Sequence, residues 1–263
     1  MFEEQHLSKP PLKVCLVSLV FTPIQAMDGY IPSVQDAFRK GGLPFYSCKK
    51  QSQVMVGIPG PLEIQEMPQW FFHDEQKNQL IVITDRSFSY STSAYEGYDS
   101  FLTRFSKYLQ LFSDVVNLTT CVMERVGLRY VNGFDTDDWR KYIKQPYAGF
   151  TLPDTPWSAL QEPNSQLTVT QITTRLKENL FGNLVVQVYR DSKPITMPVG
   201  IVCIDNKHPD LSKTKAILDI DHAATPGRTF RLNEMQQLLG VLHEVSNTLF
   251  FAVTTEAGWT KWK

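Results

Sequence analysis

The spacing of apolar residues changes several times along the chain, and these changes predict where strands and helices lie. Residues 14 to 21 are apolar on both alternating faces, which is typical of a strand covered on both sides, and Thr22-Pro23 ends the pattern. Residues 74 to 78 are turn formers and predict the tip of a hairpin. Further strands are expected at residues 54 to 58, 63 to 72, 79 to 90, 121 to 134, 167 to 176, 183 to 190, 199 to 206 and 215 to 222.

Three other segments repeat apolar residues every three or four positions, the spacing of an amphipathic helix. Tyr30-Ile31-Pro32 leads into the first, and Gly41-Gly42 ends it. The second begins near Tyr98, and the third spans about residues 232 to 250. Asp135-Thr136-Asp137-Asp138 supplies capping side chains for a short helix over residues 139 to 143. The mixture predicts an α+β fold of antiparallel sheets with amphipathic helices packed on one face.

Residues 146 to 164 interrupt these patterns with four prolines and no sustained apolar period. They are predicted to connect an N-terminal α+β half, residues 1 to 145, with a C-terminal α+β half, residues 165 to 263. Each half runs from several strands into one long helix, so an internal duplication is one interpretation. Because the same order is common in α+β proteins, a single continuous domain is the other.

Composition limits the class of protein further. The hydrophobic fraction of 42% and aromatic fraction of 12% favour a folded globule over disorder. The 26 basic and 27 acidic residues give no overall attraction to nucleic acid or anionic lipid. The four cysteines lack the paired spacing of a zinc or redox site and are expected to be reduced, mostly buried thiols. With a polar N-terminus and no apolar run of about 20 residues, the expectation is a cytoplasmic protein with no membrane contact.

Two arginines stand out in the strand expected at residues 121 to 134. Arg125 and Arg129 are four apart, so a strand would project them from the same face, roughly 13 Å from each other. A guanidinium there could hold a carboxylate or phosphate of a partner with two hydrogen bonds. The structural alternative is that each arginine pairs with an acid on a neighbouring strand, with Asp219 and Asp221 as candidates.

Asp219, Asp221 and His222 form the most enzyme-like cluster, because two carboxylates with a histidine could bind a divalent metal. Strand alternation weakens this interpretation, since it places His222 on the face opposite the two acids. The alternative is that the acids are exposed or form salt bridges. No metal ligand set is predicted from these residues.

Two further polar residues are candidates for binding. His243 lies in the C-terminal helix, where a catalytic role competes with that of a packed histidine that hydrogen-bonds a nearby strand. Asn132 is expected to end its strand and to form a turn rather than to bind a ligand. The aromatic stretches at residues 70 to 72 and 88 to 90 could stack on bases, but without interleaved lysine and arginine they are better explained as core and interface.

No phosphate-binding loop, dinucleotide fingerprint, zinc-protease motif or hydrolase elbow occurs in the sequence. No cofactor is therefore expected, and no residue is assigned a catalytic role. Whether the chain is an enzyme stays open at this point, with the missing motifs pointing away from one.

The segment from Gly127 to Asn132 reads Gly-Leu-Arg-Tyr-Val-Asn. It resembles the signature of a divergent, sporadically distributed family of bacterial and archaeal proteins of about 260 residues, in which the motif is Gly-Leu-Arg-Tyr-Ile/Val-Asn. The opening Pro-Leu-Lys-Val strand, Leu-Asp-Ile-Asp-His from Leu218, Leu242-His243 and the late Phe-Phe-Ala-Val-Thr-Thr-Glu are similar to the same family. The resemblance implies an α+β fold and an accessory role in defence, mobile-element or toxin–antitoxin systems, and it assigns no reaction.

Together these observations predict a non-enzymatic interaction protein. It is expected to form a homo-oligomer and to bind a partner, either a protein encoded nearby or a nucleic acid. Two alternatives from other classes remain. One is a metal-dependent hydrolase that uses Asp219 and Asp221, and the other is a single-stranded nucleic-acid binder that uses Arg125 and Arg129.

Overall fold

The computed structural model describes residues 7–54, 64–145, 147–148, 165–177, 180–191, 195, 197–198, 201–202 and 209–263. The described strands are β1 (Leu12–Phe21), β2 (Phe45–Val54), β3 (Ile64–His73), β4 (Gln79–Ile83), β5 (Ser87–Thr92), β6 (Val122–Phe134), β7 (Ser165–Lys177), β8 (Leu180–Asp191), β9 (Ala216–Ala224) and β10 (Arg228–Thr229). The described helices are α1 (Met27–Gly41), α2 (Tyr98–Val116), α4 (Leu232–Val253), α5 (Glu256–Trp262) and the 3-10 helices η1 (Leu118–Thr120) and η2 (Trp139–Tyr142).

The described strands form an antiparallel sheet with the hydrogen-bonded order β2-β3-β4-β5-β1-β6-β9-β8-β7, and β10 pairs with β6. This confirms the predicted α+β class. In this order β1 lies between β5 and β6, and β6 lies between β1 and β9.

The chain divides into two compact units. Unit 1 comprises Met1–Cys15, Gly127–Thr225 and Gln237–Lys263, and unit 2 comprises Leu16–Val126 and Pro226–Gln236. β1, β6 and α4 therefore contribute residues to both units. The connector predicted at residues 146 to 164 falls outside the described residues except for Tyr147 and Ala148, so the predicted division there stays a prediction.

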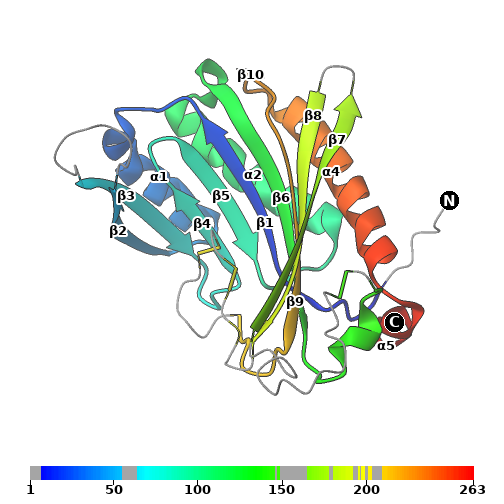
Figure 1. Ribbon diagram of the computed structural model, residues 1–263. Coiled ribbons are helices and arrows are strands. Elements are labelled where there is room, and N and C mark those ends of the chain that lie inside the picture. Colours follow the sequence, from blue (N-terminus) through cyan, green and yellow to red (C-terminus); the bar gives the residue numbers. More distant parts are fainter. Residues whose placement is uncertain are drawn as a thin grey trace. The chain divides into compact units, whose positions relative to one another are not determined.

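In unit 2, the helices α1 and α2 lie along the strands β3, β4 and β5 (Figure 1), and aromatic side chains pack between them. Phe38 of α1 meets Phe72 of β3 edge-on, with 5.0 Å between the ring centroids. Phe88 of β5 lies 5.2 Å from Phe112 of α2, and Tyr90 contacts Phe101, Phe105 and Tyr108. The aromatic stretches at residues 70 to 72 and 88 to 90 are thus buried core, as the packing interpretation predicts.

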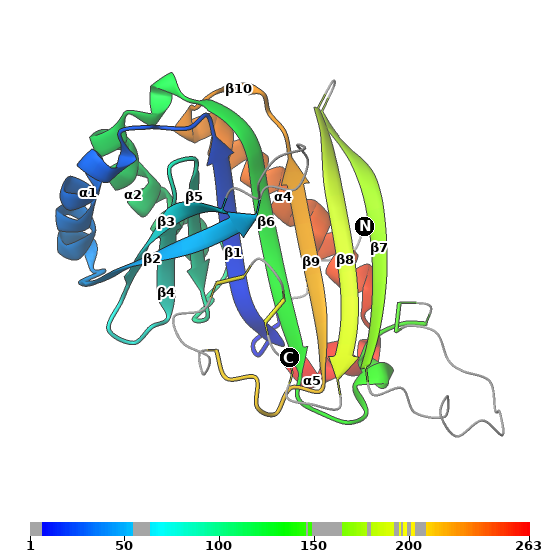
Figure 2. The same ribbon diagram turned by 60° about the vertical axis from the view of Figure 1, so that its left-hand side comes forward.

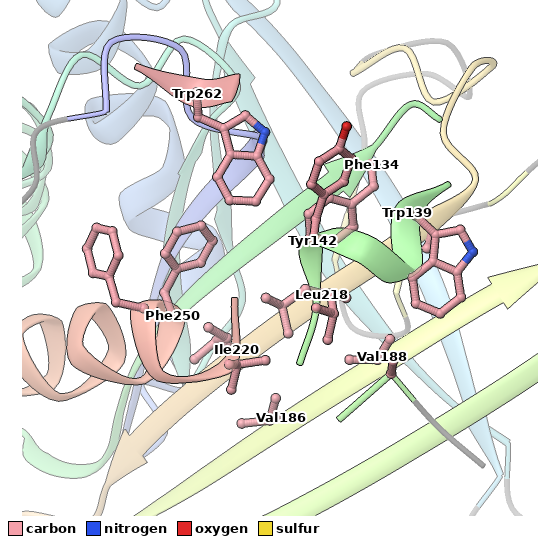
Figure 3. Close-up of a cluster of buried hydrophobic side chains, with 14 of the residues drawn as sticks. Phe134, Trp139, Tyr142, Val186, Val188, Leu218, Ile220, Phe250 and Trp262 are labelled. Carbon is pink, nitrogen blue, oxygen red and sulfur yellow. The ribbon is translucent and has the colours of Figure 1, made fainter. Parts of the chain in front are cut away.

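In unit 1, the C-terminal part of α4 and the helix α5 pack on one face of β8 and β9 (Figure 3). Because side chains alternate along a strand, Val186 and Val188 of β8 join Leu218 and Ile220 of β9 on this face. Trp262 of α5 closes the cluster against three further aromatic rings, those of Phe134, Tyr142 and Phe250. The opposite face of the same strands is where the candidate site lies.

Several predicted boundaries need correction. Residues 79 to 90 form two strands rather than one, because Thr84 and Ser87 close a turn with a backbone hydrogen bond of 3.0 Å and a side-chain bond of 2.7 Å. The helix α1 begins at Met27, with Pro32 inside it rather than ahead of it, since buried Met27 and Ile31 extend the apolar stripe. The strand expected at residues 199 to 206 falls outside the described residues apart from Ile201 and Val202, which are not in a strand.

The strand β2 was missed by the sequence pattern, because its described side chains include polar residues without alternation, such as Lys49 and Lys50. The strand predicted at residues 54 to 58 lies outside the described residues after Val54. Of the described helices, none has the length and apolar character that crossing a bilayer requires.

Candidate functional site

Arg129 and Asp219 form a buried, two-pronged ion pair between the neighbouring strands β6 and β9 of unit 1. Arg129 Nε donates to Asp219 Oδ1 at 2.9 Å, and Arg129 Nη2 donates to Asp219 Oδ2 at 2.6 Å. The two side chains are only 13% and 2% exposed. This is the neighbouring-strand pairing that the structural alternative for Arg129 predicts.

Burial and charge act against each other in this pair. Burial raises the pKa of Asp219, while the hydrogen bonds and the charge of Arg129 oppose that rise. Burial, the largest single effect, also disfavours the charged guanidinium, but the hydrogen bonds to Asp219 and the negative charges of Asp219 and Asp221 together leave the pKa of Arg129 raised. With both carboxylate oxygens held by the guanidinium, Asp219 is poorly placed to hold a metal ion as well.

Asp221 and Tyr189 lie beside the ion pair. The ladder between β8 and β9 sets Gln187 opposite Asp219 and Val185 opposite Asp221, so the two acids share one face as predicted. Burial raises the pKa of Tyr189, the charge of Asp219 adds to that rise, and Arg129 opposes it. The Tyr189 hydroxyl is buried and finds no hydrogen-bond partner among the described residues.

His222 points away from the two acids, as strand alternation predicts. It is fully buried, its Nε2 shares a hydrogen bond of 2.8 Å with the Thr174 hydroxyl, and its Nδ1 lies 3.4 Å from the Leu242 carbonyl oxygen of α4. Gly182 lies at this contact, because a Cβ there would stand 2.5 Å from Thr174 Oγ1 and 2.8 Å from His222 Nε2. The histidine therefore joins strands and helix and does not complete a metal site with Asp219 and Asp221.

His243 and Tyr130 form a second polar contact on the face that α4 covers. The Tyr130 hydroxyl and His243 Nδ1 share a hydrogen bond of 2.8 Å, and the Tyr130 side chain also hydrogen-bonds the Cys15 thiol. Burial raises the pKa of Cys15 well above its usual value, and the Tyr130 bond only partly opposes this. A thiol in this state is a poor nucleophile, so the arrangement fits packing better than catalysis.

The turn predicted at Asn132 is wrong. Asn132 lies inside β6, is 4% exposed, and donates from its side-chain amide to the Leu218 carbonyl oxygen of β9 at 3.3 Å. Since its side chain stabilises the β6–β9 pairing, the residue has a structural reason to be an asparagine.

Arg125 lies in unit 2. Its Nη1 donates to the Ser18 hydroxyl of β1 at 2.7 Å. In this contact the partner of Arg125 is a hydroxyl and not one of the acids considered as candidates. The adjacent Glu124 pairs with Arg86 at 2.6 Å, with both side chains substantially exposed.

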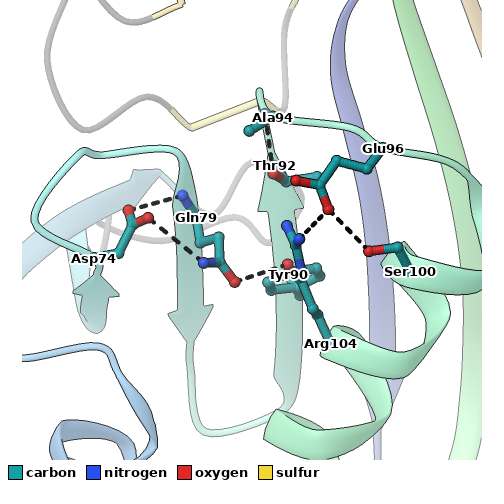
Figure 4. Close-up of polar contacts among 8 residues, drawn as sticks. All are labelled: Asp74, Gln79, Tyr90, Thr92, Ala94, Glu96, Ser100 and Arg104. Atoms are coloured by element: carbon teal, nitrogen blue, oxygen red, sulfur yellow. Dashed lines mark hydrogen bonds and ion pairs between the residues drawn. The ribbon is translucent and has the colours of Figure 1, made fainter.

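A polar cluster near the start of α2 was not anticipated from the sequence (Figure 4). Asp74 accepts a hydrogen bond of 2.9 Å from the Gln79 backbone, and Gln79 accepts one of 3.1 Å from the Tyr90 hydroxyl. Glu96 accepts from both Ser100 and Arg104. The first contacts fix the hairpin between β3 and β4, and the second pair joins the loop before α2 to the helix. The only sequence signal was an aspartate at a turn.

Groups that could hold a metal do not converge in the part of the chain that the structure describes: no three His, Cys, Asp or Glu side chains come together there. Of the cysteines, Cys15 and Cys121 are buried and Cys48 is exposed, all three as free thiols, while Cys203 lies outside the described residues.

Comparison with known proteins adds no assignment, since no protein-family profile matches the chain and no curated protein matches it either. The resemblance based on Gly127 to Asn132 stays a prediction.

Proposed function

We propose that this chain is a non-enzymatic interaction protein, one that self-associates and binds a partner protein through the outer face of β7 and β8. The observation that carries the proposal is a set of exposed large apolar side chains on that face, with Leu167 and Val169 at one end of the strands and Phe181, opposite Arg175, at the other. Leu167 is 61% exposed, Val169 51% and Phe181 55%. In the β7–β8 ladder Leu167 lies opposite Tyr189 and Val169 opposite Gln187, so these residues lie on the face opposite the buried core of unit 1.

Exposed apolar side chains that gather on one surface are typical of protein interfaces, because contact with a partner removes them from water. Burying the exposed part of three such side chains would contribute a few kcal/mol, at about 25 cal/mol per Å². This surface lies beside Tyr189 and the Arg129–Asp219 pair. The ion pair fixes the register of β6 and β9 beneath the surface and is not itself offered for binding.

A protein partner fits this surface better than a nucleic acid does. Nucleic-acid binding depends on Lys and Arg that neutralise phosphates. Among the side chains of β7 and β8 whose exposure the structure describes, the basic ones are Arg175 and Lys177, near the turn between the strands. Around Leu167 and Val169 the outer face is apolar and uncharged. The family resemblance is the basis for two further parts of the proposal. One is that the partner is encoded nearby, and the other is a role in defence, mobile-element or toxin–antitoxin systems in the cytoplasm.

The experiment is a comparison of two tagged variants purified from the native host at low salt. The face variant combines Leu167→Gln, Val169→Gln and Phe181→Gln. The control is Tyr30→Gln on α1, which replaces another exposed aromatic, 36% exposed. We expect a stoichiometric partner with the wild-type protein and the control, and its loss with the face variant. Equal recovery of the partner by all three proteins would contradict the proposal, and a nucleic acid released by salt would replace the protein partner by a nucleic-acid one.

A further inference from the structure

The strand β7 ends the hydrogen-bonded order of strands. Among the described residues it pairs with β8 and with no other strand (Figure 2). Successive residues of an antiparallel strand direct their backbone groups to alternate sides. A terminal strand therefore presents a row of N–H and C=O groups to which a further strand can pair. At 13 residues, β7 offers a longer ladder than the five or six residues of an average strand.

Most proteins protect such an edge with lysine, proline or a bulge. From residue 165 to residue 174, β7 has none of these: it is uncharged and rich in Thr, Val and Ile, which favour strands. The register shift and the charges Arg175 and Lys177 come only at its end. The other terminal strand, β2, carries Lys49 and Lys50 in its middle. Of the two terminal strands that the structure describes, β7 is the one without these protections over residues 165 to 174.

We propose that β7 pairs with β7 of a second copy of this chain, antiparallel and about a two-fold axis at Gln171. The proposal rests on the self-association in the proposed function and specifies its geometry. Pairing about this axis sets Gln171 opposite its own copy and Arg175 opposite Leu167, and the register shift between Arg175 and Lys177 ends the regular ladder there.

Charge selects the direction of pairing. In the antiparallel arrangement the two copies of Arg175 are eight residues apart along the ladder, about 27 Å at 3.4 Å per residue. A parallel arrangement would instead set Arg175 beside Arg175 and Lys177 beside Lys177, at a strand spacing of about 4.8 Å, where like charges repel. The strand thus pairs favourably with itself in only one direction.

The geometry also explains how self-association and partner binding share one region. An axis perpendicular to the sheet keeps corresponding side chains on the same face. Leu167 and Val169 of the two copies would then lie on the same face of the joined sheet, on either side of the Gln171 pair. Pairing through the strand edge leaves that face free for the partner.

The test is a charge swap at the axis, with mass in solution as the measurement. Gln171 is exposed and donates to the Asn183 side chain at 2.7 Å. Gln171→Lys or Gln171→Glu would each set like charges opposite one another in the pair. The matched control is Asn183→Lys, which adds the same charge on the same face but on β8, one strand in from the edge. Thermal unfolding establishes that every variant is folded.

We expect a dimer for the wild-type protein and for the control across a dilution series in light scattering or sedimentation. Each Gln171 variant should dimerise on the order of tenfold more weakly, because like charges lie opposite each other. An equimolar mixture of the two variants should restore the dimer, since Lys then faces Glu.

Three results would overturn the pairing. Dimers of both Gln171 variants as stable as the wild type would assign self-association to another surface and leave the proposed function standing. Equal weakening by Asn183→Lys would assign it to the outer face in place of the edge. A monomeric wild-type protein throughout the series would remove self-association itself, and partner binding would then stand or fall with the face variant.

Discussion

Removal of Arg129 is the perturbation with the clearest expected consequence. In Arg129→Ala, Asp219 loses two hydrogen bonds of 2.9 and 2.6 Å and its opposite charge at a position where its side chain is only 2% exposed in the wild-type protein. An uncompensated charge in such a place is costly, because neither water nor protein solvates it. If Arg129 instead served a partner on the surface, its removal would leave the folded protein unchanged.

The expected magnitude follows from breaking a buried pair, which costs about 3–5 kcal/mol. For a chain of this size that corresponds to a fall in melting temperature of roughly 6–20 °C. Arg129→Met combined with Asp219→Leu removes both charges together and should cost far less than Arg129→Ala, or even stabilise the fold, since no unpaired charge remains. The control is Arg86→Ala, whose partner Glu124 is 39% exposed and whose own side chain is 47% exposed; this change should cost less than about 1 kcal/mol.

The assay is urea unfolding at pH 7, followed by circular dichroism, for the wild type, the single variants and the double variant. The midpoint and the slope of each transition separate a change in stability from a change in the unfolded state. A loss below about 1 kcal/mol for Arg129→Ala, similar to that of Arg86→Ala, would refute the structural role. It would return Arg129 to the list of partner-binding residues.

Two further predictions concern the contact between His222 and Thr174. Burial lowers the pKa of His222, so below about pH 6.5 the unfolded chain binds a proton that the folded chain does not. The free energy of unfolding should therefore fall as the pH drops below about 6.5. Urea titrations from pH 7.5 to pH 5 should show a weaker dependence of stability on pH in His222→Phe than in the wild type. Gly182→Ala places a Cβ 2.5 Å from Thr174 Oγ1 and should lower the free energy of unfolding by about 1–3 kcal/mol through overpacking. Adding Thr174→Ala in the same chain should recover part of that stability. A melting temperature of Gly182→Ala equal to that of the wild type would contradict the close approach.

Local patterns in the sequence were sufficient for most elements of the fold. The stripe that begins at Tyr98 predicted α2, and the alternation over residues 121 to 134 predicted β6, since apolar periodicity reports which face of an element is buried. The pattern failed for β2, which carries polar residues and has no apolar period to detect. It also merged β4 and β5, because the turn between them depends on Thr84 and Ser87 rather than on glycine or proline.

The candidate residues divide in a similar way. Strand alternation alone placed Asp219 and Asp221 on one face and His222 on the other, because that alternation is a local property of the backbone. The pairing of Arg129 with Asp219, of Tyr130 with His243 and of Asn132 with Leu218 joins residues that are 86 to 113 positions apart.

The α+β class, the long helices and the faces of the strands could be predicted from the amino-acid pattern, because each depends on neighbours along the chain. Which strand ends the sheet and which apolar side chains stay exposed could not, because both depend on contacts between distant segments. The alternation of residues in β7 would suit an inner strand equally well. Nothing in the local sequence predicts that Leu167 and Val169 are exposed. That outcome depends on the order in which distant strands pair, and the order is set by the burial of the whole chain rather than by any one segment.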